Sequence, residues 1–184
     1  APRLLTTLPM GGQVGTDLEI AVTGQFIEQA TDLRFSDPGI IAEPLLDGTG
    51  KALPGRYRVT IPSETTPGIV EASVMTRLGL SASRVFTVGL LPEVTQQKPN
   101  LDIGSAMPLV INTVCNAAMT ARAVDFYQFQ AVKDQRILVD CAAKGIDSKL
   151  NPVVIVADSQ AAERLHPATL RAPHRSMLAT APHN

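Results

Sequence analysis

Residues 16–23, Thr-Asp-Leu-Glu-Ile-Ala-Val-Thr, alternate between apolar and polar side chains. Leu18, Ile20 and Val22 fall on one side of an extended chain, because successive side chains of a strand point to opposite faces. The acidic and hydroxyl side chains fall on the other side, and Gly24 ends the pattern. The stretch therefore predicts a strand that is half buried, with one face on a core.

The same period of two returns four more times within the first ninety residues, at 32–35, 56–61, 69–74 and 84–88. Turn signals separate these stretches, since both an Asp-Pro-Gly and a Thr-Pro-Gly tripeptide lie between them. Short alternating strands between such turns are typical of a β-sandwich. We therefore expect a sandwich from about Gly12 to Val88, with almost no helix.

The strand pattern stops after residue 90 and resumes after residue 100. Residues 91–99 are polar and proline-containing without a period, as in a linker. We expect a domain at 1–90, a linker at 91–99, a second β domain at 100–160 and a poorly ordered tail at 161–184. Within the second domain the expected strands are 108–111, 124–131, 135–142 and 152–157. The tail mixes arginine, histidine and proline without a clean period, and we expect at most a short helical piece near its start.

The charge and hydropathy of the chain exclude two classes of partner. Among 184 residues the formal net charge is -1, so the chain has no basic excess for binding nucleic acid or an anionic membrane surface. No apolar run approaches the roughly 18 residues that a spanning helix requires. We expect neither nucleic-acid binding nor a membrane span.

The positions of the histidines argue against common forms of catalysis. All three, His166, His174 and His183, lie in the expected tail, so the expected folded region contains none. This removes Ser-His-Asp and Cys-His arrangements and histidine-based zinc sites. The glycine-rich residues 48–51 resemble a phosphate loop only superficially, because Ala52 follows where a hydroxyl residue is needed. The prediction is a chain that is not an enzyme.

The chain has two cysteines, Cys115 and Cys141, which are too few for a disulfide scaffold or a structural zinc site. A disulfide between them is compatible with a secreted protein. A pair of buried free thiols is the other interpretation, because Cys141 lies on the apolar side of its expected strand. The sequence leaves both open.

The first ninety residues resemble the IPT/TIG group of immunoglobulin-like domains. The resemblance rests on turn residues and on three apolar strand faces that keep the group's spacing. The matching residues are Pro9, Gly11, Gly12, Gly15, Thr16, Leu18, Ile20, Val22, Gly24, Val59, Thr60, Ile61, Pro62, Pro67, Gly68, Val70, Ala72, Val74, Gly79, Ser81 and Phe86. The resemblance implies an immunoglobulin-like β-sandwich.

The second part is similar to the opening half of a bacterial pre-peptidase C-terminal domain, and the tandem order is typical of secreted planctomycete proteins. The similarity lies in residues 98–100 (Lys-Pro-Asn), 124–129, 135–140 and 146–156. It implies a partial, jelly-roll-like β-sandwich, so the expected fold class is all-β throughout. The chain departs from that family at Lys98, where an acidic residue is typical, and after Ser159, where further strands would follow.

Hard oxygen ligands near the start of the second domain make calcium the one cofactor considered. Asn100, Asp102 and Asp125 are the candidate ligands, because calcium prefers several carboxylate and amide oxygens. The alternative is that Asp125 and Asp147 satisfy backbone groups at strand edges and turns. No other cofactor is expected.

The sequence favours a non-catalytic binding or spacer module of a secreted, periplasmic or cell-surface multidomain protein. The expected partner is an extracellular protein or polysaccharide, besides neighbouring domains of a longer chain. An alternative is a protease-associated segment needed for secretion or processing. A hydrolase that depends on carboxylates is a remote third hypothesis.

Overall fold

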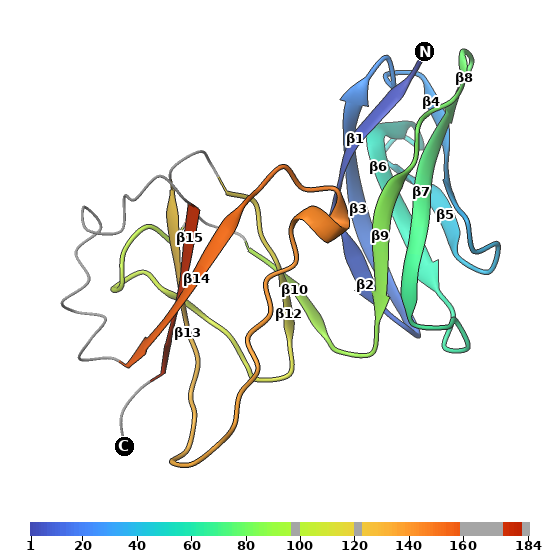
Figure 1. Cartoon of the computed structure of the whole chain (residues 1–184). Coiled ribbons are helices and arrows are strands. Elements are labelled where there is room, and N and C mark those ends of the chain that lie inside the picture. Colours follow the sequence, from blue (N-terminus) through green and yellow to red (C-terminus); the bar gives the residue numbers. More distant parts are fainter. Residues whose placement is uncertain (97–99, 120–122, 159–174, 182–184) are drawn as a thin grey trace. The chain divides into compact units, whose positions relative to one another are not determined.

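The computed structural model describes residues 1–96, 100–119, 123–158 and 175–181. The chain divides into two compact units, unit 1 (Ala1–Glu93) and unit 2 (Val94–Asn184), and each is described by itself. Within the described residues, strands dominate and the helical content is one short 3-10 turn, η1 (Lys144–Ile146) (Figure 1). The expectation of an all-β chain is therefore confirmed.

Unit 1 is a sandwich of two sheets. The first has the strand order β1 (Arg3–Leu8), β3 (Thr16–Gln25), β6 (Ala52–Ile61), β5 (Ile41–Leu46). The second has the order β2 (Gly11–Gln13), β9 (Arg84–Gly89), β7 (Gly68–Thr76), β4 (Ala30–Phe35), with β8 (Gly79–Leu80) paired to β7. All pairs are antiparallel except β2 with β9. If the seven main strands are lettered in chain order without β2 and β8, the sheets read ABED and CFG, the immunoglobulin-like arrangement.

The core of unit 1 lies between these sheets, and the period of two determines which side chains enter it. Ile20 and Val22 of β3 are buried as predicted, and Leu18 packs against the core as a partly buried residue. The other buried members are Ile40, which lies just before β5, and residues of both sheets: Leu4, Leu33, Tyr57, Val59, Ile61, Val70, Ala72, Val74, Phe86 and Val88. Phe86 meets Phe35 edge to face with ring centroids 5.0 Å apart. Burial of each large apolar side chain contributes about 1.5–3 kcal/mol, so this shared core stabilises the sandwich.

The glycine-rich turn between β5 and β6 is closed by its own side chains. Asp47 Oδ1 accepts hydrogen bonds from the Thr49 hydroxyl at 2.6 Å and from the backbone N–H groups of Thr49 and Lys51 at 2.8 and 3.0 Å. These bonds, the Thr49 hydroxyl first, lower the pKa of Asp47. The turn amides therefore already hold an anionic partner, which confirms that these residues form a turn and not a phosphate loop.

Unit 2 contains a four-stranded sheet of parallel pairs, in the order β11 (Met107–Pro108), β13 (Val124–Gln128), β15 (Arg175–Ala181), β14 (Pro152–Asp158). A second ladder joins β10 (Glu93–Thr95) to β12 (Val114–Asn116). Its small core consists of Ala106, Val124 and Phe126, with Ile103, Ile155 and Ala157 packed against it. The parallel pairs differ from a jelly roll, whose strands are antiparallel. The residues expected as a linker also contribute a strand, β10.

Three local expectations about unit 2 were wrong. Of residues 108–111, only Pro108 belongs to a strand, β11, and Val110 is exposed. No strand forms over residues 135–142, and Leu138 is 91% exposed there. The alternation of that segment is that of a strand, but no neighbouring strand pairs with it. Conversely, residues 175–181 of the expected tail form β15, which pairs with β13 on one side and with β14 on the other. The rest of the expected tail, including residues 161–165, lies outside the described residues. Among the described residues no helix is long and apolar enough to cross a membrane.

Candidate binding site

Strand β13 buries four consecutive side chains, Val124 to Tyr127, which is unusual for a strand that contains a carboxylate. Val124 and Phe126 belong to the core of unit 2. Asp125 and Tyr127 alternate with them and are only 2% and 1% exposed. Acidic residues are rarely buried this completely unless they are paired. Asp125 is therefore a buried acidic group inside unit 2, and we examined which polar groups surround it.

Two amide side chains lie in the neighbourhood of Asp125. The Asn100 carbonyl oxygen accepts the Phe126 N–H at 2.7 Å, which holds the buried Asn100 beside β13. The Gln96 N–H donates to the Asn116 carbonyl at 2.8 Å and continues the ladder of β10 with β12. Burial raises the pKa of Asp125, and an interaction with the Gln96 side chain works in the opposite direction. The backbone thus brings an asparagine, a glutamine and an aspartate to one region.

Each of these three side chains has a buried polar atom without a hydrogen-bond partner. The atoms are Gln96 Nε2, Asn100 Nδ2 and Asp125 Oδ2. An unsatisfied buried polar group costs about 1–3 kcal/mol, so native proteins rarely leave one without a water or a ligand. Because the Gln96 side chain interacts with Asp125, the Asn100 amide nitrogen is the atom of this group that most needs a further partner.

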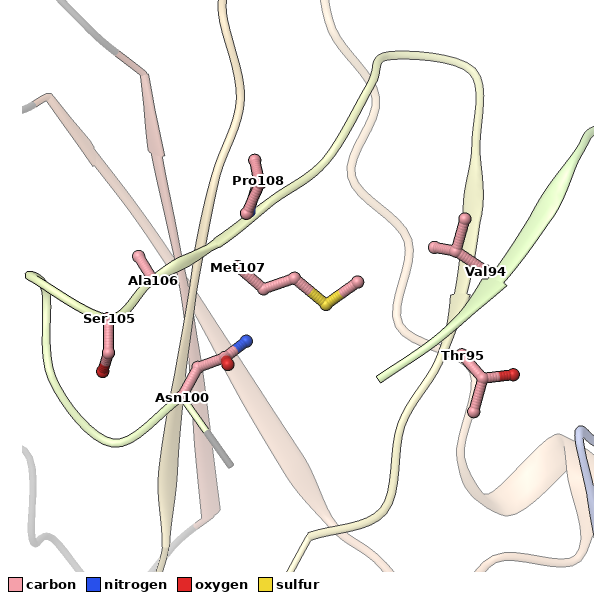
Figure 2. A pocket seen from close by; sticks show the side chains of 7 residues that line it. All are labelled: Val94, Thr95, Asn100, Ser105, Ala106, Met107 and Pro108. Carbon is pink, nitrogen blue, oxygen red and sulfur yellow. The ribbon is translucent and has the colours of Figure 1, made fainter. Parts of the chain in front are cut away.

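Asn100 also lines a hollow of 570 Å³ in unit 2. The other lining residues are Val94 and Thr95 of β10, and Ser105, Ala106, Met107 and Pro108 (Figure 2). Figure 2 shows the amide of Asn100 directed toward the space beside the Met107 side chain. The hollow thus has a mainly apolar wall, two hydroxyl groups and one buried amide, as small-molecule sites commonly have.

The predicted calcium ligands are only partly brought together. Asn100 and Asp125 lie in the same region, but Asp102 is exposed and closes its own turn, where its Oδ1 accepts the Ser105 N–H at 2.8 Å. The described residues contain no group of three or more His, Cys, Asp or Glu side chains suited to a metal. Calcium commonly takes six to eight oxygen ligands. The calcium site stays a prediction, and the function proposed below does not depend on it.

Asp147 has the role of a turn residue that the sequence suggested for it. It adopts the left-handed conformation, with φ of 60°, at the end of η1. Its N–H donates to the Lys144 carbonyl at 3.2 Å. Aspartate tolerates this conformation better than most residues do. Asp125, by contrast, is buried inside unit 2, and its Oδ2 atom has no hydrogen-bond partner.

Cys115 and Cys141 are free thiols, each half-buried. This structure contains no bond between them, and the disulfide considered from the sequence stays a prediction. Burial raises the pKa of both thiols, and Cys115 also interacts with the Tyr127 hydroxyl. Cys141 lies in the segment that forms no strand, so the expected pairing of two strands that would align the cysteines is absent.

Sequence reasoning missed Gln96, Thr95 and Met107. Gln96 and Thr95 lie in the stretch interpreted as a linker, and Met107 is the first residue of the two-residue strand β11. Their only signal was the side-chain chemistry itself, since neither periodicity nor a motif marks them. The hollow forms because β10 and the segment up to β11 lie close together, which is a tertiary effect.

Comparison with protein-family models gives no match, and comparison with curated proteins gives none. Solved structures give partial likenesses. One is the gamma-CGTase of alkalophilic Bacillus clarkii, with 22% identity and a TM-score of 0.35 over 53% of this chain. Another is the SGBP-B protein of the mixed-linkage glucan utilization locus of Bacteroides ovatus, in complex with a mixed-linkage heptasaccharide, with 12% identity and a TM-score of 0.34 over 56% of this chain. The chain spans 14% and 24% of these two proteins, and likenesses of this size carry no argument about function.

Proposed function

We propose that the chain is a non-catalytic binding or spacer module of a secreted or cell-envelope multidomain protein, and that the hollow of unit 2 is its binding site. The observation that carries the binding role is the hollow itself, into which the buried Asn100 directs an amide nitrogen without a partner. A purely mechanical spacer has no need of enclosed polar groups whose burial costs free energy.

The arrangement of unit 1 supports the same proposal. An immunoglobulin-like sandwich with a continuous apolar core is a stable scaffold that many cell-surface proteins share. Its fold alone does not specify an activity. On the residues quoted above, we further propose that unit 1 is related to IPT/TIG domains and unit 2 to pre-peptidase C-terminal domains, with an extracellular polysaccharide or protein as partner.

The test measures retention and turnover together. The full chain is incubated with insoluble cellulose, chitin and xylan and with a panel of hydrolase substrates, and both the bound fraction and the released products are quantified. We expect retention on at least one matrix without release of soluble products. Turnover that is lost in Asp125→Asn or Asp147→Asn would overturn the proposal, because it would make these carboxylates catalytic.

A further inference from the structure

We propose that unit 2 associates with a second copy of this chain, and that residues 135–142 of one copy form an antiparallel strand along the outer edge of β14 in the other. The association is separate from the proposed binding function, because none of these residues lines the hollow. Two features of the described part of unit 2 carry the proposal: a strand edge with no neighbouring strand, and a strand-like segment with no edge to pair with.

Strand β14 takes the last position of the four-stranded sheet. It pairs with β15 on one side, and no described strand pairs with it on the other. Residues 153–157 are Val-Val-Ile-Val-Ala, without a charge, and Val153 and Val156 are 37% and 55% exposed. An edge strand presents backbone N–H and C=O groups that can pair with another chain, and β-branched residues favour such pairing. Strand β14 therefore offers an apolar edge suited to an added strand.

Residues 135–142 have the sequence of a strand but pair with no described strand. They are Gln-Arg-Ile-Leu-Val-Asp-Cys-Ala, and the backbone contains neither a turn nor a bend over this stretch. Residues 136–142 make no backbone hydrogen bond to another described residue. Leu138 is 91% exposed and Val139 is 38% exposed. A segment with these properties gains hydrogen bonds and apolar burial when it meets an open strand edge.

A compact turn follows the segment and fixes its end within its own chain. Ala143 is buried, and its carbonyl oxygen accepts the N–H groups of Ile146 and Ser148, both at 3.0 Å. In this arrangement the segment and β14 of the same chain are not paired. The edge of a second copy can be reached without undoing the turn, and we therefore assign the added strand to another copy.

The side chains of the two strands select an antiparallel register. With Leu138 opposite Val156, the most exposed apolar side chain of each stretch meets the other. The same register places Arg136 opposite Asp158, and opposite charges at facing positions stabilise a strand pair. A parallel arrangement with the same apolar contact would instead place Asp140 opposite Asp158, and like charges at facing positions are destabilising.

The experiment measures the mass of the full chain by sedimentation equilibrium over a concentration series. A reducing agent is present, so that the cysteines form no link between chains. We expect the mass to rise from that of one chain toward that of two. Leu138→Lys and Val156→Asp each place a charge in the contact, and each should weaken self-association at least about tenfold. Val110→Asp, at an exposed valine of unit 2 outside the strands, is the matched control and should associate as the native chain does.

Mixing the two variants tests the register. In the mixture the lysine of Leu138→Lys lies opposite the aspartate of Val156→Asp, so the mixture should associate more strongly than either variant alone. A mixture that associates no more strongly than its components would overturn the pairing of these two positions. Val94→Trp, which fills the hollow, should leave self-association unchanged. If thermal unfolding shows that Val156→Asp unfolds the chain, Leu138→Lys at its exposed position keeps the test decisive.

Three further results would overturn the inference while leaving the proposed function intact. A chain that stays monomeric at every concentration forms no such contact. Association that Val156→Asp weakens and Leu138→Lys does not is pairing between two copies of β14, without residues 135–142. Association that neither variant weakens takes place through another surface.

Discussion

At the scale of single residues, Asp125 links stability to pH. Burial raises its pKa, so between the unfolded value of about 3.9 and the folded value the native state binds more protons than the unfolded state. The stability of unit 2 is therefore expected to fall as the pH rises through the folded pKa. Asp125→Asn should unfold at a higher temperature than the native chain at pH 7, and the difference should vanish near pH 4.

The two tyrosines make this measurement specific. Tyr57 lies in unit 1 and Tyr127 in unit 2, and the chain has no tryptophan. In a Tyr57→Phe background, tyrosine fluorescence reports unit 2 alone. A difference between Asp125→Asn and its parent that is the same at pH 4 and pH 7 would show that Asp125 does not titrate differently in the two states.

We expect that any side chain at Gly24 destabilises unit 1, because the backbone of β1 lies too close to this position. It faces Leu4 where β1 and β3 lose their regular register, and an added Cβ would collide with the Arg3 carbonyl oxygen. We expect Gly24→Ala to destabilise unit 1 by about 1–3 kcal/mol. Gly48→Ala is the control, because nothing lies within 4 Å of the added carbon, and it should stay within about 0.5 kcal/mol. The free energy of unfolding of each variant is measured by chemical denaturation, followed by Tyr57 fluorescence in a Tyr127→Phe background. If Gly24→Ala and Gly48→Ala destabilised unit 1 equally, the collision with the Arg3 carbonyl would not be the cause.

At the scale of elements, a substitution in β15 tests whether this strand stabilises the four-stranded sheet of unit 2. It lies between β13 and β14, so a proline inside it removes a backbone donor from a strand with a neighbour on each side. We expect Ala179→Pro to destabilise unit 2 by more than about 3 kcal/mol, measured by denaturation through Tyr127. Ala118→Pro, outside any strand, is the matched control. If Ala179→Pro left the transition unchanged, the segment would contribute nothing, as the sequence first suggested.

The sequence predicts an element well where its own side chains determine the outcome. Strand β3 was predicted because its period of two coincides with a buried face over its whole length. The failure at 135–142 has the opposite origin, since the same period is present but no strand lies beside it. Strand β15 contains alanine and methionine, which favour strands weakly, and it forms through pairing with two distant segments.

The candidate site was predictable only in part for the same reason. Asn100 and Asp125 stood out as oxygen ligands, and both are buried in one region of unit 2. Gln96 and the walls of the hollow did not stand out, because no sequence signal states which loops a fold will bring together. The sequence showed which single residues could bind a ligand, whereas the structure was needed to show which of them form one site and how they are arranged.

At the scale of the whole molecule, the account assigns different tasks to the two units. Unit 1 has the more extensive core, and we assign it the role of a scaffold, although the buried Thr7 hydroxyl has no hydrogen-bond partner there. Unit 2 has a smaller core and contains both the hollow and the unpartnered side chains. Binding without turnover through unit 2 is the central claim.

The most direct test compares the native chain with Val94→Trp in the retention experiment, on whichever polysaccharide retains the native chain, while soluble sugars are assayed in the same tubes. The account predicts that the native chain is retained, that Val94→Trp stays in solution, and that neither releases sugar. Equal retention of the two chains, or release of soluble sugar by the native chain, would contradict it.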